Sequence, residues 1–269
     1  MQRVHFISGL PRSGSTLLAA LLRQNSKTEA GMSSPVAALI GSLLTEMGGS
    51  REHSVFLDDA RRQKILKGIF TNYYADCEAS VIFDTSRAWC ARMNLIDALF
   101  PEAKVIACVR HMPWVIDSVE RLVLRNVFQP SGIFGYTTTG TVYSRAEAIA
   151  KGEGMVGFGY NALKEAFFGP FAHKLMLVQY ETLVTDPARV LQAIYDFTGT
   201  EPFTHDFDNV SYDADEFDRK LGTPGLHHVR RKVAAEPRRT VLPPDVFQRF
   251  ENDAFWRNPD LNPHRVAVI

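Results

Sequence analysis

Short apolar runs of strand length recur along the chain, and longer stretches with the apolar spacing of helices separate them. The runs are Val4–Ser8, Val81–Asp84, Val105–Val109 and Leu175–Gln179. Parallel strands that are buried on both faces read as continuous apolar runs, and a helix usually connects each to the next. The alternation therefore predicts an α/β fold, with a parallel sheet flanked by helices on both faces.

Amphipathic patterns in the intervals predict the helices of this fold. Proline or a small polar residue opens several of them, as expected at helix starts. The predicted helices are Ser15–Gln24, Val36–Met47, Asp58–Cys77, Trp89–Phe100, Trp114–Asn126, Glu147–Phe168 with a break near Gly152–Gly159, Pro187–Thr198 and Pro244–Asn252.

The composition suits one large domain over residues 1–269. Of the 269 residues, 45% are hydrophobic and 22% are charged, enough apolar residues to bury a substantial core. Thirty basic residues balance thirty acidic ones, so no overall field favours nucleic acid or an anionic membrane. Any anion site must therefore be local.

The cysteines and the lengths of the apolar runs indicate the cellular compartment of the protein. The three cysteines, Cys77, Cys90 and Cys108, lack the spacing of metal ligands, so we expect reduced core residues and no metal site. The first strand begins near Val4, which leaves no room for a signal peptide, and no apolar run approaches the ~18 residues of a membrane span. These features predict a cytoplasmic protein without a membrane span.

A glycine-containing loop, G-L-P-R-S-G-S-T over residues 9–16, follows the first apolar run directly and leads into a helix. Backbone N–H groups of such a loop point inward, and the helix dipole adds roughly half a positive charge, so a phosphate or sulfate can bind there. The alternative is an ordinary helix capped by Ser13 or Ser15. The first glycine, the arginine and the hydroxyl pair together favour the anion site. We call residues 9–16 the anion loop.

The position of the cation in this loop separates two chemistries. In the triphosphate-binding pattern G-x-x-x-x-G-K-[ST], a lysine reaches the β and γ phosphates. Here Ser15 stands at the lysine position, and the cation is Arg12 inside the loop. The form P-R-S-G-[ST]-T-L resembles the 5′-phosphosulfate loop of sulfotransferases that use 3′-phosphoadenosine 5′-phosphosulfate (PAPS), most closely tyrosylprotein sulfotransferases and related bacterial enzymes. The resemblance implies a P-loop type of nucleotide-binding fold in which Arg12, Ser13, Gly14, Ser15 and Thr16 bind PAPS.

A second motif fits the same family. The apolar strand Val105–Val109 ends at Arg110, and Ser118 follows on the next predicted helix. Because carboxyl ends of strands line the ligand crevice of such sheets, Arg110 should face the same crevice as the anion loop. The pair resembles the 3′-phosphate motif of sulfotransferases, which implies that Arg110 and Ser118 bind this phosphate.

Two later segments extend the resemblance. The run L-V-Q-Y-E-T-L-V-T-D-P over residues 177–187 looks like a Y-E-x-L-x-x-x-P segment of the family, whose tyrosine, here Tyr180, lies near the adenine. Arg231 and Lys232 occupy the region where family members supply a basic loop that closes over the 3′-phosphate. We therefore expect residues 226–240 to close over the cofactor, and we call them the late basic segment.

The catalytic residues are harder to assign. By analogy with phosphoryl transfer, sulfuryl transfer needs positioning, a cation on the leaving side and a base for the acceptor hydroxyl. Arg12 suits the cationic role. The family carries catalytic residues after its second strand, where this chain has Asp84 as the expected base and Arg87 in place of a lysine. Glu29 and His111 are alternative bases, and Asp84 could instead cap a helix or bind magnesium.

Three functions remain open from the sequence. The first is sulfuryl transfer from PAPS to a hydroxyl on a tyrosine peptide, a carbohydrate or a small metabolite. The second is a P-loop small-molecule kinase that uses ATP and magnesium, and the third is a nucleotide-binding module without catalysis. The glycine- and aromatic-rich residues 127–160 are a candidate substrate lid.

Overall fold

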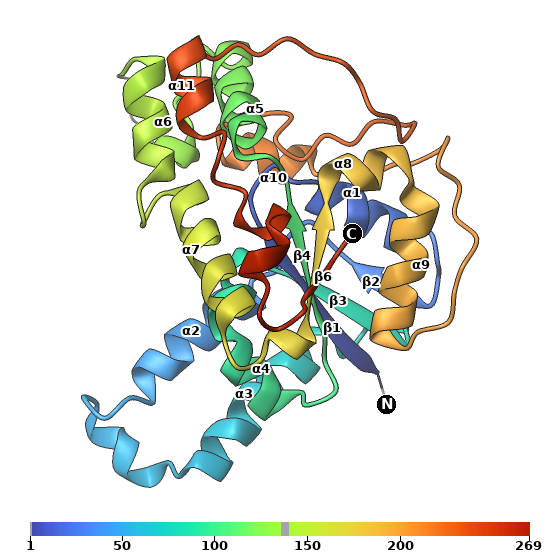
Figure 1. The fold of residues 1–269 in the computed structure, drawn as a ribbon. Coiled ribbons are helices and arrows are strands. Elements are labelled where there is room, and N and C mark those ends of the chain that lie inside the picture. The colour runs from blue at the N-terminus through green and yellow to red at the C-terminus, as the bar shows by residue number, and fades with distance from the viewer. Residues whose placement is uncertain (1, 136–139) are drawn as a thin grey trace.

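The computed structural model describes residues 2–135 and 140–269 (Figure 1). Its sheet has six strands in the order β2-β3-β1-β4-β5-β6, and every neighbouring pair is parallel. The predicted fold class is confirmed. The strands are β1 Arg3–Gly9, β2 Thr28–Ala30, β3 Val81–Thr85, β4 Val105–Val109, β5 Leu175–Gln179 and β6 Ala267–Val268.

The two edge strands were not predicted from the sequence. β2 has three residues and β6 has two, so neither makes an apolar run long enough to stand out. The central strands follow the pattern more closely, and β4 and β5 have the predicted bounds. Chain order diverges on the two sides of β1, so a crevice is expected where β1 and β4 end.

Helices occupy the intervals between the strands. The α-helices are α1 Ser15–Leu22, α2 Val36–Glu46, α3 Asp59–Tyr73, α4 Met93–Leu99, α5 Met112–Arg125, α6 Val142–Ala150, α7 Met155–Phe168, α8 Tyr180–Thr185, α9 Pro187–Thr198, α10 Asp215–Lys220 and α11 Pro244–Arg249. The 3₁₀ helices are η1 Glu52–Phe56, η2 Arg87–Arg92, η3 Gly132–Phe134, η4 Ala172–Lys174, η5 Phe255–Arg257 and η6 Pro259–Leu261.

Several helix bounds differ from the predicted ones for local reasons. The Asp58 carboxylate accepts the Arg61 N–H at 2.7 Å, so α3 begins one residue later than predicted, and it ends at Tyr73. The predicted break near Gly152–Gly159 falls at residues 151–154, and Gly159 lies inside α7. A Cβ on Gly159 would lie 3.2 Å from the Gly9 carbonyl oxygen, so this glycine lets α7 approach the end of β1.

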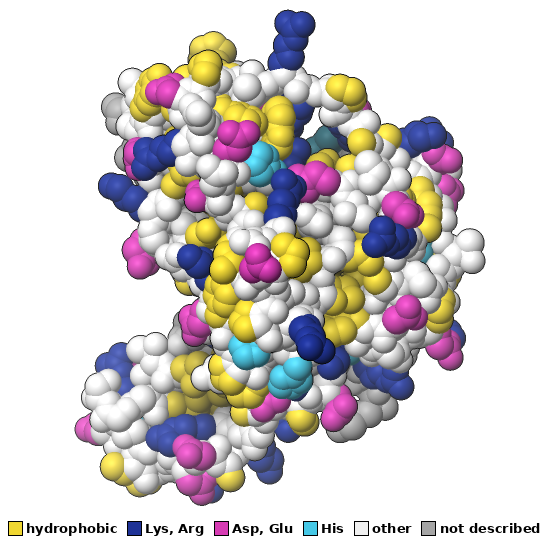
Figure 2. Space-filling view, viewed as in Figure 1, with side chains coloured by type: hydrophobic (Ala, Val, Ile, Leu, Met, Phe, Trp, Pro, Cys, Tyr) yellow, Lys and Arg dark blue, Asp and Glu magenta, His cyan; other side chains and the backbone are white. Residues whose placement is uncertain are grey.

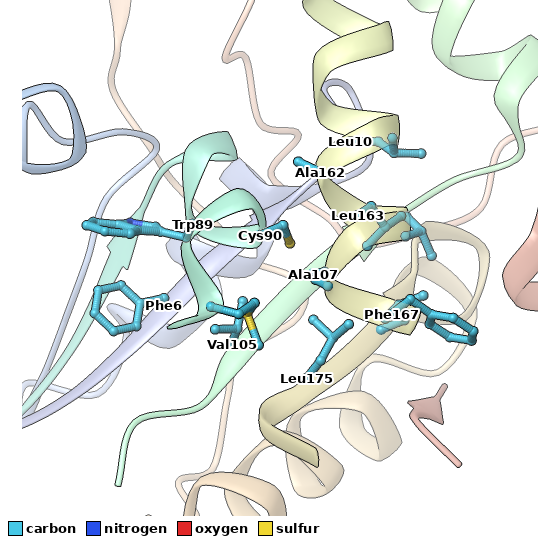
Figure 3. Close-up of a cluster of buried hydrophobic side chains, with 14 of the residues drawn as sticks. Phe6, Leu10, Trp89, Cys90, Val105, Ala107, Ala162, Leu163, Phe167 and Leu175 are labelled. Carbon is cyan, nitrogen blue, oxygen red and sulfur yellow. The ribbon is translucent and has the colours of Figure 1, made fainter. Parts of the chain in front are cut away.

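Each face of the sheet carries a hydrophobic layer. Phe6 of β1 and Ala107 of β4 pack in one cluster with Leu163 of α7 (Figure 3), whereas Ile7 and Ile106 belong to a second cluster that includes residues of α1 and α9. Alternate residues of a strand point to opposite faces, which accounts for the division. Helices therefore cover both faces, as predicted.

An arm made of α2, η1 and α3 protrudes from the main body (Figures 1 and 2). It lies away from the carboxyl ends of the central strands, where the candidate site is found. None of the described helices is long and apolar enough to cross a membrane.

Candidate active site

A cleft of about 1370 Å³ opens at the carboxyl ends of β1, β3 and β4. The anion loop and the first turn of α1 form one wall, and residues 85–88 after β3 lie beside them. α5, the start of α8 and most of residues 225–238 complete the enclosure. The cleft thus lies where the strand order predicts a crevice.

Two glycines give the anion loop its shape. Gly9 and Gly14 have φ values of 102° and 96°, in the left-handed region that glycine adopts without strain. A Cβ on Gly9 would lie 2.2 Å from the Cys108 carbonyl oxygen, and one on Gly14 would lie 2.8 Å from Cδ2 of Tyr180. The loop therefore passes against β4 and α8 at distances that only glycine permits.

The Ser13 side chain stabilises this loop from its buried side. Its buried hydroxyl hydrogen-bonds the carbonyl of Leu10 and, at 2.8 Å, that of Cys108, so it does not line the cleft. Gly14 is the N-cap of α1, and no side chain caps the helix. Neither serine therefore acts as the cap of the ordinary-helix alternative.

The first turn of α1 leaves backbone donors at the cleft. Gly14, Ser15 and Thr16 line it, and in the described part of the chain the backbone N–H groups of Ser15 and Thr16 have no hydrogen-bond acceptor. Free N–H groups at the positive end of a helix attract an anion. This arrangement is the one predicted from the loop sequence.

Arg12 is a desolvated cation without a carboxylate partner. Its Nε donates to Ser118 Oγ at 3.0 Å, and its guanidinium also donates to the Leu226 carbonyl. Burial, and then the charge of Arg110, lower the pKa of Arg12 to about 10. Among the residues described, no carboxylate lies within ion-pair distance of it, so an anionic ligand would relieve this repulsion.

Arg110 and Tyr180 form the second part of the predicted site. The Arg110 guanidinium lies 4.1 Å from the centroid of the Tyr180 ring and donates to the Arg12 carbonyl at 3.3 Å. Burial lowers the pKa of Arg110, and the nearby Arg238 lowers it further. The structure thus brings Arg12, Arg110, Ser118 and Tyr180, which come from three predicted motifs, together at one cleft.

The late basic segment is placed differently from the prediction in detail. The Arg231 guanidinium donates to Asn209 Oδ1 at 2.9 Å and does not line the cleft. Lys232 does line it, but its exposed ammonium pairs with Asp208 at 2.8 Å. In this structure the Arg231 side chain is held by Asn209 outside the cleft, and its binding to the nucleotide stays a prediction.

Arg238 is the residue of this segment that reaches the other cations. Its guanidinium pairs with the buried Asp117 at 2.9 Å and lies 5.1 Å from the Trp114 ring centroid. In the sequence, Arg238 is one of several basic residues within 226–240, and nothing local indicates a partner on α5. Its position between Trp114 and Asp117 emerges only from the fold.

Asp84 does not lie where a base is needed. It is fully buried at the end of β3, outside the cleft lining. Its carboxylate accepts hydrogen bonds from Ser34 at 2.5 Å, Tyr74 at 2.7 Å and Trp89 Nε1 at 2.7 Å. Burial raises its pKa, although these three donors oppose the rise. With its oxygens occupied and its side chain outside the cleft lining, Asp84 is a core carboxylate here, and the geometry argues against both the base and the magnesium-ligand interpretations.

Of the other predicted catalytic residues, one lines the cleft and two do not. Arg87 lines the cleft with an exposed side chain, and partial desolvation by the cleft walls lowers its pKa. Glu29 lies on the edge strand β2, and the His111 ring hydrogen-bonds the Glu251 carbonyl at 3.0 Å. Neither alternative base lines the cleft.

Residues 127–160, the predicted lid, include η3, α6 and the first part of α7. Ile133, Met155 and Phe158 contribute apolar side chains to the cleft wall. Residues 136–139 of this segment lie outside the described residues. The segment therefore borders the cleft, and a lid motion stays a prediction.

Comparison with known proteins identifies the family to which this chain belongs. The sequence model described as "Sulfotransferase family" matches residues 5–205, which include the anion loop, Arg110, Ser118 and Tyr180. The chain belongs to the sulfotransferase family. This membership makes it an enzyme of the PAPS-dependent class and counts against the kinase alternative.

Several solved sulfotransferase structures are similar to this chain. The sulfotransferase domain from the curacin biosynthetic pathway matches with a TM-score of 0.50 and 19% identity over 76% of each chain. The corresponding domain of the Synechococcus PCC 7002 olefin synthase matches over 92% of each chain, with 22% identity and a TM-score of 0.48. A sulfotransferase from Alicyclobacillus acidocaldarius matches over 82% of this chain and 90% of its own, with 14% identity and a TM-score of 0.49. No curated protein matches the chain.

Proposed function

We propose that this chain, acting as one domain over residues 1–269, binds PAPS in the cleft and catalyses in-line sulfuryl transfer to an acceptor hydroxyl. The observation that carries the proposal is the convergence of Arg12, Arg110 and the free N–H groups of Ser15 and Thr16 on one cleft. Neither guanidinium is paired with a carboxylate among the described residues. A ligand with separate 5′ and 3′ anionic groups fits this charge distribution.

Each group of residues would have a distinct task. The loop amides and the Thr16 hydroxyl would hold the 5′-phosphate, and Arg12 would neutralise charge at the leaving oxygen. Its delocalised guanidinium stays protonated at any working pH and offers donors to two oxygens at once. When bound, PAPS supplies an activated sulfuryl group on that phosphate.

The 3′-phosphate would bind on the α5 side of the cleft. Arg110 faces it from the end of β4, and Arg238 adds a second cation that repels Arg110 until an anion lies between them. Ser118 connects the 3′-phosphate side of the cleft to the 5′-phosphate side, since its hydroxyl contacts Arg12. Tyr180 lies between Gly14 and the Arg110 guanidinium and would form the nucleotide side of this wall.

The acceptor is proposed only as a class. Ile133, Met155 and Phe158 give the cleft an apolar wall that could receive a phenol, a sugar face or a small metabolite. A hydroxyl on any of these would serve the same reaction.

Calorimetry tests the donor site directly. We expect 3′-phosphoadenosine 5′-phosphate (PAP) to bind about 10- to 100-fold more tightly than adenosine 5′-phosphate, since a charge-assisted hydrogen bond contributes about 1.5–3 kcal/mol. EDTA should not change the affinity, and ATP with magnesium should bind weakly. Equal affinity for nucleotides with and without the 3′-phosphate would reject the assignment.

A second measurement separates catalysis from binding alone. The protein is incubated with PAPS labelled in its sulfuryl group and a cell extract, and labelled products are identified. Transfer to a hydroxyl compound supports the proposal. Tight PAP binding without any transfer would favour the nucleotide-binding module.

A further inference from the structure

His227, at the start of the late basic segment, is held by a buried carboxylate. Its Nδ1 lies 2.5 Å from Asp218 Oδ1, and its backbone N–H donates to Asp218 Oδ2 at 2.8 Å. Asp218 belongs to α10 and is 1% exposed. One carboxylate thus fixes both the ring and the backbone of one histidine.

This contact determines which ring nitrogen is basic. A carboxylate accepts hydrogen bonds, so Nδ1 of His227 carries the proton and Nε2 keeps its lone pair. His227 lines the cleft, and in the described chain Nε2 has no hydrogen-bond partner. The arrangement is that of a general base with its orienting carboxylate.

The surroundings place this base beside the proposed reaction centre. The preceding residue, Leu226, accepts a hydrogen bond from Arg12 through its carbonyl. The charged groups that act on His227 are Asp218 from α10, Arg12 from the anion loop and Arg87 from η2. Burial lowers the pKa of His227, Asp218 opposes this, and the two arginines add to it, so the ring is neutral near pH 7.

We propose that His227 is the general base for the acceptor and that Asp218 is its positioning residue. The inference rests on the proposed sulfuryl transfer and gives the base role to His227 in place of Asp84. The acceptor oxygen forms a bond to sulfur while its proton passes to Nε2 of His227. The bond from sulfur to the bridging phosphate oxygen breaks, and its electron pair stays on that oxygen beside Arg12.

The test compares His227→Ala with His53→Ala, an exposed histidine outside the cleft. Initial rates of labelled transfer from PAPS into the extract should fall about 10²- to 10⁴-fold in His227→Ala, the usual contribution of a general base. Added imidazole should restore part of this rate, and the PAP dissociation constant and melting temperature should stay near wild type. The His53→Ala rate should be unchanged.

Asp218→Asn tests the positioning role through pH. Asp218 raises the pKa of His227, so its neutralisation should move the acidic limb of the rate profile to lower pH and reduce the rate less than His227→Ala does. A wild-type rate and acidic limb in His227→Ala would overturn the proposal. So would a rate loss that imidazole does not relieve and that accompanies a lower melting temperature. Failure of the wild-type protein to bind PAP would instead reject the proposed function itself.

Discussion

The anion loop and the late basic segment line the same cleft, but different interactions hold them in place. The loop is fixed by its own backbone, through Gly9 and Gly14, and by the buried Ser13 hydroxyl beneath it. The late basic segment contains no helix or strand, and two buried carboxylates, Asp117 and Asp218, hold it near its two ends. The loop thus depends on its own backbone and on the adjacent strand β4, whereas the segment depends on anchors from α5 and α10.

The difference extends to the cations that each region presents. Arg12 is held in a desolvated position, so its charge is weakly screened and acts strongly on a nearby anion. In the late basic segment, Arg230 pairs with Glu236 and Lys232 pairs with Asp208, all on the exposed surface. Exposed pairs of this kind contribute little, so basic residues close in sequence can differ greatly in effect.

After His227→Ala, the largest expected effect on activity is that of Arg12→Ala. Charge on the leaving oxygen is greatest in the transition state, and loss of one preorganised donor typically costs about 10²- to 10³-fold in turnover. Steady-state kinetics with PAPS should show this fall, and calorimetry should show a smaller change in PAP affinity. Arg12→Lys should recover part of the rate, although it loses the two-point contact. Wild-type turnover in Arg12→Ala would remove the leaving-group role.

Asp84 is a third buried carboxylate. Asp117 and Asp218 hold the late basic segment, whereas Asp84 binds side chains of the core, so its loss should affect stability more than activity. Asp84→Ala should lower the free energy of unfolding by about 3 kcal/mol or more, because it leaves three donors without their acceptor and each unsatisfied buried donor costs about 1–3 kcal/mol. Urea unfolding measures this, and turnover of the folded fraction should persist. A large loss of turnover at unchanged stability would restore Asp84 as the base.

The pH dependence of stability gives an independent check on Asp84. A carboxyl group whose pKa rises on folding adds a pH-dependent component to stability, which is present while the group is protonated. Its contribution is complete below its ordinary pKa of 3.8 and is lost as the pH rises through the raised value. This component of the stability profile should be absent in Asp84→Asn.

Arg110→Ala should act mainly on binding. The contact with the 3′-phosphate exists in the ground state and the transition state alike, so its loss should raise the KM for PAPS about 10- to 100-fold, equivalent to about 1.5–3 kcal/mol. The kcat should change less. The reverse pattern, a fall in kcat at constant KM, would assign Arg110 to another task.

The smallest effects come from a pair within the late basic segment. Arg238→Ala should weaken PAP binding about tenfold, the lower end for a charge-assisted contact. Arg231→Ala should leave PAP binding unchanged, because its guanidinium is committed to Asn209 outside the cleft. Titration calorimetry of both variants compares them directly, and equal losses would mean that the segment rearranges on binding.

The sequence by itself determined the central strands, the anion loop and the pairing of this loop with Arg110 and Ser118. Apolar runs mark strands that are buried on both faces, and a strand followed at once by a glycine loop and a helix needs no distant partner. The bounds of β4, β5 and α9 were correct for the same reason. The short elements β2, β6, α8 and α10 were missed because so few residues carry no periodic signal.

Only the tertiary structure decided the roles of single charged residues. The sequence singled out Asp84 as a base and did not single out Asp218. In the fold, Asp84 meets Ser34, Tyr74 and Trp89 in the core, while Asp218 orients a cleft histidine. Arg231 and Arg238 likewise differ only in which distant side chain each one meets. The function of a charge depends on its solvation and its neighbours, and for these residues the neighbours come from elements far away along the chain.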